Sequence, residues 1–482
     1  MATQRITFGE WLPDQPGLSG ALTTANNVIS QSIGYGPFKS AANIASGASD
    51  DLVTLHTTKN SSNDSLLFAA GLAKIFKVSA IGVYTKVSPA TDYTTATADR
   101  IRFSQFGKSV ITTNNSEKLQ YYNVDTSTEF ADLDATAPVA KYITVVRDFV
   151  VVANLTEGAD KYSSRVRWSG INDETDWTYS QTSQADYQTL PDGGNIVGIR
   201  GGEFGLVFMD NAIYRMSYLG TPLIFQFDNI SRGTGCFNEN SIAQYSGLSF
   251  FLSDDGFYVC DGQTLKPIGT EKVDRYFYET VELTNINSMS TAVDPINKLV
   301  IWNYPTTGNL RKLLIYNFKT SKWTSADAPF VKYVSDASTG VVTLEELDSI
   351  DPNIDTFPQS LDSSAYIGGQ HFLGGTNGGN IYSYTGLPSA GLIISGDIDL
   401  GSNSVVTLAR PQVDNGSATV AMASRKTLSD SISFSTSVAA TSENRVSLRN
   451  SGRYHRVQVN PTGNSWKNAI AVDLEIVGQG TR

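Results

Sequence analysis

Apolar and polar residues alternate along most of this chain in short runs that recur at a regular interval. Each run pairs an apolar stretch with a tight polar turn and a second stretch that carries Tyr, Phe or Trp, as in residues 205–216 and 248–260. Alternation of this kind, rich in aromatic and β-branched residues, predicts β-strands. Equivalent central strands recur after about 40–70 residues, near the length of one β-propeller blade. We therefore predict an all-β chain in which one unit of three or four strands is repeated around a ring.

The repeats place the β-propeller at residues 61–324 and 365–389. Six units are clear in the sequence. A further unit at residues 66–84 is weaker, and it either forms a seventh blade or supplies a closing strand. The fold class that we predict is thus an all-β propeller of six or seven blades.

Three stretches fall outside the repeats. Residues 1–60 are rich in turns and aromatic residues and predict an extended N-terminal arm. Residues 325–364 are polar and irregular and predict an insertion or a long loop. Residues 390–482 alternate differently and predict a small C-terminal β-sandwich.

Composition narrows the expected functions. The chain has 482 residues, with 36 Lys and Arg against 47 Asp and Glu and a formal net charge of -11. Nucleic-acid binding depends on cations that neutralise phosphates, so we do not expect a general nucleic-acid binder. Cys236 and Cys260 are too few for a disulfide framework, and we do not expect a disulfide between them; the strand pattern around Cys260 predicts a small buried side chain. Residues 1–16 lack the apolar segment of a signal peptide and no apolar run is long enough to cross a bilayer, which predicts folding in the cytoplasm.

Catalytic and metal-binding signals are scarce in the sequence. His56, His371 and His455 stand in unrelated segments, without the spacing of metal ligands. Neither standard glycine-rich phosphate loop occurs. We therefore expect no catalytic residue, no metal and no cofactor, and we interpret the chain as a non-enzyme.

One turn resembles the Asp-box of sialidase-type propellers. Ser253, Asp255 and Gly256 match its Ser-x-Asp-x-Gly pattern, followed by the aromatic Phe257. We interpret it as a structural turn, in which the Asp side chain caps amides of its own hairpin and Gly supplies a positive φ. A glycosidase would also need two convergent carboxylates, which one copy of this turn cannot supply.

Several longer segments are specific enough to compare with a family. They are residues 164–177, 213–227, 251–262 and 268–275, preceded by 12–18, 27–29 and 34–38 near the start of the chain. Together they resemble the tail hub, or nozzle, proteins of short-tailed bacteriophages, also called packaged-DNA-stabilisation or tail tubular proteins. The resemblance covers about residues 10–325, and the final hundred residues are only loosely similar.

The resemblance implies a structural protein of the virion tail, synthesised in the host cytoplasm. Family members build a β-propeller body, and six copies form a ring that continues the DNA channel, retains packaged DNA and opens for ejection. The implied partners are the other subunits of this homo-hexamer, the tail adaptor ring, tail fibres or spikes, the double-stranded viral DNA that passes without sequence-specific contacts, and a host receptor at the distal end. The alternative is a glycan-binding or glycan-cleaving β-propeller adhesin of the tail.

Two sets of residues are candidates for contacts in such a ring. In the arm, Trp11, Tyr35 and Phe38 are predicted anchors on the adaptor or a neighbouring subunit, unless the arm packs on its own propeller. The acidic residues of the 325–364 stretch are predicted to contribute to a channel constriction or gate, unless that stretch is only a solvated loop: Asp336, Glu345, Glu346, Asp348, Asp351 and Asp355. Acidic walls would let DNA slide, because a duplex carries one negative charge per ~1.7 Å of its axis.

Overall fold

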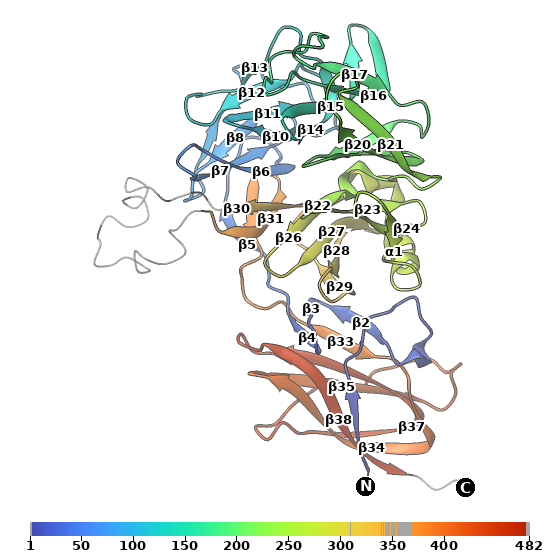
Figure 1. Ribbon diagram of the computed structural model, residues 1–482. Helices are drawn as coiled ribbons and strands as arrows, with labels where there is room; N and C mark the ends of the chain where they lie inside the picture. The colour runs from blue at the N-terminus through green and yellow to red at the C-terminus, as the bar shows by residue number, and fades with distance from the viewer. Residues whose placement is uncertain are drawn as a thin grey trace.

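Strands make up most of the structure and form two bodies (Figure 1). The computed structural model describes residues 2–308, 310–338 and 369–478, together with residues 340, 342, 348 and 353. The larger body is a β-propeller, and the smaller is a β-sandwich that contains both chain ends. Among the described residues, no helix has the length and apolar character needed to span a membrane.

The first four blades of the propeller are separate antiparallel sheets of four strands, arranged in chain order. Their strands are β6 (Thr54–Lys59), β7 (Ser65–Ala70), β8 (Ile75–Val78) and β9 (Tyr84–Lys86); β10 (Arg102–Phe106), β11 (Ser109–Thr113), β12 (Gln120–Asn123) and β13 (Ala131–Asp132); β14 (Val139–Val146), β15 (Phe149–Glu157), β16 (Asp160–Trp168) and β17 (Asp186–Thr189); β18 (Ile196–Arg200), β19 (Gly205–Met209), β20 (Ala212–Tyr218) and β21 (Phe225–Arg232). The weak sequence unit at 66–84 is thus a complete blade, with β6 as its first strand.

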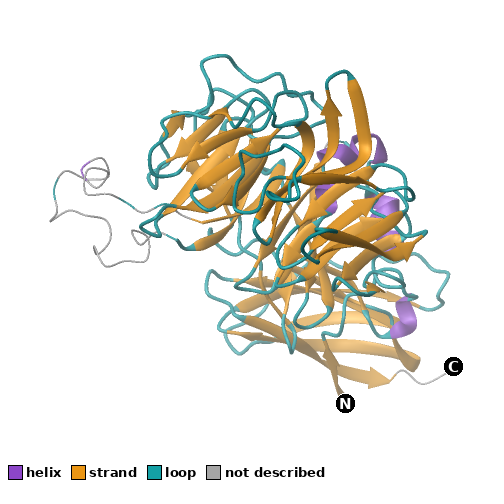
Figure 2. Cartoon of the chain, turned by 45° about the horizontal axis from the view of Figure 1, so that its top comes forward, coloured by secondary structure: helices purple, strands orange, loops and turns teal. Residues whose placement is uncertain are grey.

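Three more groups of strands complete the ring (Figure 2). They are β22 (Ala243–Tyr245), β23 (Leu248–Ser253), β24 (Gly256–Cys260) and β25 (Leu265–Pro267); β26 (Ser290–Asp294), β27 (Leu299–Thr306), β28 (Leu310–Asn317) and β29 (Lys322–Asp327); β30 (Tyr333–Ser338), β31 (His371–Asn377) and β32 (Asn380–Ser383) with β5 (Ala42–Ala45). Six blades are therefore separate four-stranded sheets, and the β26–β29 blade continues into a larger sheet. The predicted propeller is confirmed, and its blades number seven when the β26–β29 blade is included.

The second strand of each blade explains why the sequence repeats so clearly. β11, β19 and β27 are buried along their whole length, and β15 and β23 along most of it. A strand covered on both faces reads as a continuous apolar run, because neighbouring blades leave it no solvated side. These runs are the signal that the sequence shows.

The smaller body is built from both ends of the chain. Its C-terminal strands are β33 (Leu392–Ser395), β34 (Ile398–Asp414), β35 (Ser417–Arg425), β36 (Val438–Ala439), β37 (Val446–Thr462) and β38 (Asn468–Gly478). The predicted C-terminal β-sandwich is confirmed. Four N-terminal strands join it, namely β1 (Ala2–Thr7), β2 (Leu22–Asn26), β3 (Val28–Ser30) and β4 (Tyr35–Pro37). β1 pairs with β38 over its full length, and β2 pairs with β33.

Two predicted segments therefore differ from the structure. Residues 1–60 do not form an extended arm, because β1–β4 belong to the sandwich and β5 and β6 to the propeller. Their strands are three to six residues long, too short to show a period, and pairing satisfies their backbone groups. The predicted insertion 325–364 begins within β29 and contains β30, the first strand of the last blade.

A continuous sheet joins the two bodies at β2. Asn26 of β2 pairs in parallel with Ser325 of β29, while the other edge of β2 pairs with β33. The Asn26 amide donates to the Asp327 carboxylate over 2.7 Å, and the Asn27 backbone N–H donates to the Ser325 carbonyl over 2.8 Å. Residues of both bodies also share one hydrophobic core, which runs from Trp302 and Trp323 to Val457 and Leu474. The junction is packed as tightly as an interior.

Within residues 2–308, 310–338 and 369–478, the helices are few and short. They are η1 (Gly17–Ser19), η2 (Glu239–Ser241), α1 (Asp274–Thr280) and η3 (Leu283–Ser288). The N-terminus of α1 is capped from a distant part of the chain, because the Asp14 carboxylate accepts from the backbone N–H groups of Arg275 and Tyr276 over 2.9 and 2.8 Å. A carboxylate suits this position, where free N–H groups carry partial positive charge. Asp14 is thus a second contact between the N-terminal segment and the propeller.

Candidate functional site

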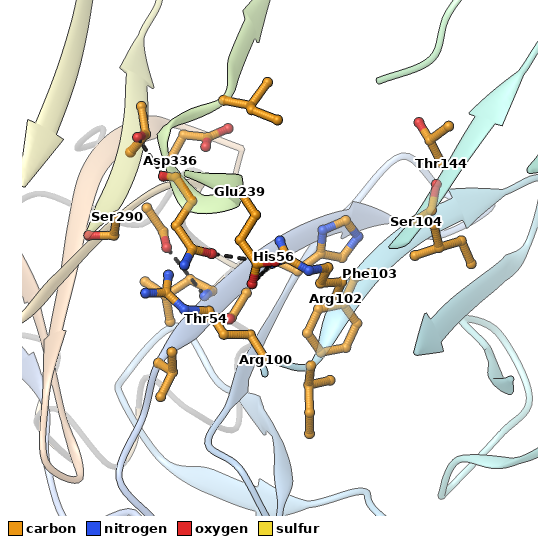
Figure 3. Close-up of a pocket in the computed structure, with 18 of the residues that line it drawn as sticks. Thr54, His56, Arg100, Arg102, Phe103, Ser104, Thr144, Glu239, Ser290 and Asp336 are labelled. Carbon is orange, nitrogen blue, oxygen red and sulfur yellow. Dashed lines mark hydrogen bonds and ion pairs between the residues drawn. The ribbon is translucent and has the colours of Figure 1, made fainter. Parts of the chain in front are cut away.

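The axis of the propeller contains a polar cavity of about 320 Å³ (Figure 3). Residues on or beside the first strands of the blades, together with η2, form its wall. They are Val53, Thr54, Leu55, His56, Arg100, Ile101, Arg102, Phe103, Ser104, Ile143, Thr144, Ile199, Arg200, Glu239, Asn240, Ile242, Ser290, Thr291, Val334, Ser335 and Asp336. Since liquid water occupies about 30 Å³ per molecule, the cavity has room for roughly ten waters.

Strand geometry brings these side chains together. Successive residues of a strand point to opposite faces, so Arg100, Arg102 and Ser104 recur on one side of the segment that becomes β10. The first strands meet at the axis, and residues distant in sequence become neighbours there. The ring thereby gathers isolated polar residues into one site.

Glu239 is the best-paired charge in this site. Its carboxylate accepts from Arg102 over 3.0 Å and from Lys141 over 2.7 Å, and the Tyr142 hydroxyl also donates to it. Arg102 donates in addition to the Asn240 side-chain oxygen over 3.2 Å. Burial alone would raise the pKa of Glu239, but the two cations outweigh it and hold that pKa below its ordinary value. Glu239 is therefore ionised at neutral pH and is already neutralised by its partners.

Arg100 and Arg200 have different surroundings. Arg100 donates to the backbone carbonyls of Asn287 and Met289 over 3.0 and 2.6 Å, and its guanidinium lies 4.9 Å from the centre of the Tyr333 ring. Arg200 donates to the carbonyls of Ile199 and Ile242. Burial, together with repulsion from Arg102, lowers the pKa of each of these two arginines to about 10. Both remain cationic at neutral pH.

His56 and Asp336 complete the ionisable groups of the wall. The His56 ring stacks on Phe103 with 5.2 Å between centroids, and burial lowers its pKa to about 4. It is therefore neutral at pH 7. The Asp336 side chain is exposed to the cavity, yet the surrounding protein raises the pKa of its carboxyl. Three arginines thus face two carboxylates across one small space.

This arrangement is chemically suited to holding a polar or charged group. Glu239 is occupied by ion pairs, and among the described residues no carboxylate forms an ion pair with His56 of the kind that prepares a general base. Within the part of the chain that the structure describes, no group of three or more His, Cys, Asp or Glu is placed to hold a metal ion. Arginine guanidinium groups are instead the usual partners of planar and tetrahedral oxyanions.

The predicted interface anchors of the N-terminal segment are interior residues. Trp11, Tyr35 and Phe38 are only 1, 1 and 3% exposed. The Trp11 indole donates to the Thr23 carbonyl, and the Tyr35 hydroxyl donates to the Gly9 carbonyl over 2.7 Å. The prediction that these rings anchor another subunit is wrong for this structure, because the rings pack inside their own chain.

The structure describes two of the predicted channel or gate residues, Asp336 and Asp348. Asp336 lies on the wall of the axial cavity, as part of β30. Asp348 is exposed. Glu345, Glu346, Asp351 and Asp355 lie outside the described residues, and their role stays a prediction.

The Asp-box-like turn works differently from the prediction. Gly256 has a φ of 144°, as expected for Gly, but the Asp255 carboxylate accepts from the Tyr258 hydroxyl over 2.8 Å. The Phe257 amide donates to Asp274 over 3.1 Å, so a carboxylate from α1 caps this hairpin. Ser253 is buried at the end of β23, and its carbonyl accepts from Tyr278. The turn is structural, with Asp274 in the role expected of Asp255.

Both cysteines are buried free thiols, which confirms the predicted burial of Cys260 and the expectation that no disulfide joins the pair. Cys236 and Cys260 belong to the same hydrophobic cluster between the fourth and fifth blades. Burial raises the pKa of Cys236 to about 12, so this thiol is unreactive at neutral pH.

Sequence reasoning missed Arg100, Arg102, Arg200 and Glu239. The spacing of Arg100 and Arg102 was the available signal, because two arginines at i and i+2 in a first strand share one face. That this face lines the axial cavity follows only once the blades have closed into a ring.

Comparison with solved structures finds WD40 domains, and comparison with family models and curated proteins finds no match. Among solved structures, the extracellular domain of a hybrid two-component system from B. thetaiotaomicron matches with a TM-score of 0.42 and 12% identity over 79% of this chain, which spans 44% of that chain. The WD40 domain of Neurospora crassa Pan2 matches with a TM-score of 0.39 and 8% identity over 72% of this chain and 95% of that one. The WD40 domain of Toxoplasma gondii coronin matches with a TM-score of 0.39 and 10% identity over 78% of this chain and 87% of that one. We base no functional argument on likenesses of this strength.

Proposed function

We propose that this chain is a structural subunit of the tail hub, or nozzle, of a short-tailed bacteriophage, where a ring of copies continues the DNA channel, retains packaged DNA and permits its ejection. The family resemblance of residues 10–325 suggests this role. In the same proposal the chain is not an enzyme and acts in the virion tail with the adaptor ring and fibres as its neighbours.

One observation in the structure carries the mechanical part of the proposal. The β26–β29 blade, β2 and the sandwich form one continuous sheet, so force applied to either body passes through backbone hydrogen bonds to the other. The shared core and the Asp14 cap on α1 reinforce the same junction. A subunit that resists the pressure of packaged DNA needs such coupling, whereas a catalytic or lectin propeller does not.

The DNA path in this proposal lies between subunits and not through the propeller itself. The axial cavity has room for roughly ten waters, and the Arg102–Glu239 pair lies on its wall. A duplex whose major groove alone is about 12 Å wide cannot enter it. The excess of acidic residues in the chain would then disfavour tight contacts between the ring and DNA.

Localisation in purified particles tests the proposal. We expect antibodies against the chain to label the tail tip, and quantitative mass spectrometry to find about six copies per virion, as the family resemblance implies. The purified chain should bind the adaptor ring in a pull-down. Binding to host polysaccharide with a peripheral, trimeric location would favour the adhesin alternative, and particles that lack the chain would exclude both roles.

A further inference from the structure

We propose that the axial cavity of the propeller binds one small oxyanion, of the phosphate or carboxylate class, between Arg100, Arg102 and Arg200. This inference concerns the cavity inside one chain and does not depend on the proposed role in a tail.

Unpaired nitrogen atoms on the wall are the first argument. Arg102 Nε and His56 Nε2 are buried, and neither has a hydrogen-bond partner among the residues that the structure describes. Both residues line the cavity, and Figure 3 shows them side by side with Glu239. Buried polar atoms are nearly always paired, so these two nitrogen atoms show that the described protein groups do not fully satisfy the polar atoms of this wall. A guanidinium can only donate, and it therefore selects an acceptor.

The balance of charge is the second argument. Glu239 is shared by Arg102 and Lys141, and neither Arg100 nor Arg200 forms an ion pair with a carboxylate of the described residues. Both donate to backbone carbonyls instead. Glu239 and Asp336 act on these two arginines only at longer range, and the three arginines of the wall outnumber its two carboxylates. Buried cations in excess are costly, and an anion between them lowers that cost.

The size of the cavity fits a small ion. A volume of about 320 Å³ accommodates a phosphate or acetate with several waters, and excludes a polymer such as a nucleic acid. Asp336 lies on the same wall, with its side chain exposed to the cavity. The same carboxylate repels an anion, and its removal gives a test with a defined sign.

Isothermal titration of the full chain with inorganic phosphate, and separately with acetate, at constant ionic strength tests the site. We expect saturable binding of one ion of at least one kind, with a Kd below about 10 mM. Arg200→Gln should weaken this binding at least about tenfold, which is the usual effect of losing one hydrogen bond to a charged group. The matched control is Arg232→Gln, at an exposed arginine of β21, which should leave the affinity unchanged.

The direction in which Asp336→Asn changes the affinity decides between an anion site and a cation site. It should tighten binding several-fold, because it removes a negative charge from the wall, whereas a cation site would respond in the opposite direction. Since Asp336 is exposed, this variant stays folded even if Arg200→Gln does not. Binding of phosphate or of acetate supports the proposal and identifies the class of anion. Absence of saturable binding of both, or weaker binding by Asp336→Asn, overturns it.

Discussion

Asn27 offers a direct measure of how strongly the two bodies are joined. Its backbone has a φ of 57°, and its side chain makes three hydrogen bonds at the junction, two of them to Asp327 of β29 and one to Ala390 beside β33. The amide group donates to the Asp327 carboxylate over 3.3 Å and to the Ala390 carbonyl over 3.1 Å, and the side-chain oxygen accepts from the Asp327 backbone N–H over 2.9 Å.

Asn27→Ala should lower the free energy of unfolding by about 3 kcal/mol. Three hydrogen bonds at a half-exposed site contribute about 2 kcal/mol together. Placing alanine in the left-handed region costs about 1 kcal/mol more, since asparagine tolerates that conformation better. Asn27→Gly should lose only the contribution of the hydrogen bonds, about 2 kcal/mol, because glycine adopts a positive φ freely.

Urea unfolding followed by tryptophan fluorescence measures this loss, and calorimetry shows whether the sandwich and propeller then unfold separately. Asn63→Ala is the matched control, because Asn63 also has a positive φ, of 67°, but lies in the turn between β6 and β7. It should lose about 1 kcal/mol and keep a single transition. If Asn27→Ala lost no more than this control, our account of the junction would be refuted.

Two other changes test the packing near α1. Phe257→Ala should cost about 3–5 kcal/mol in the same urea assay, because its ring is fully buried with its centroid 4.8 Å from that of Trp302 and 5.1 Å from that of Phe277. Phe330→Ala, at a ring that is 63% exposed, should change stability by less than about 0.5 kcal/mol. Asp274 should make stability pH-dependent: burial, opposed by the Phe257 amide, raises its pKa to about 7, so the folded state binds this proton more tightly than the unfolded state. Stability from this group is present below pH 4 and is lost as the pH rises to about 7, and Asp274→Asn should flatten that slope in unfolding curves measured across this range. An unchanged slope would contradict the assignment.

The sequence predicted the propeller because its strongest signal repeats. Strands such as β15 and β19 are buried on both faces and appear in the sequence as unbroken apolar runs. One such run recurs in each blade. The same reasoning failed for β2, β3 and β5, whose three to five residues are too few to show alternation. Their structure depends on partners such as β33 and β32, which lie more than three hundred residues away in the chain.

The candidate site could not be predicted for a related reason. Arg102 and Glu239 have no common motif, and only the closure of the ring brings them within 3.0 Å. Trp11 and Tyr35 misled in the opposite direction, since an aromatic residue in a turn-rich segment suits an interface and an interior equally well until the covering strands are known. Asp274 took the role expected of Asp255 because a helix from outside the local motif supplied the nearer carboxylate.

The pairing of β5 with β32 and of β1 with β38 has a consequence for how the molecule is made. The ribosome releases the first member of each pair early, and that member then stays unpaired until a strand more than three hundred residues later has emerged. A truncated product leaves a gap in the circle of blades and an open edge on the sandwich, both of which invite aggregation. Emergence of β32 and β38 is therefore the step that closes the ring of blades and covers the edge of the sandwich.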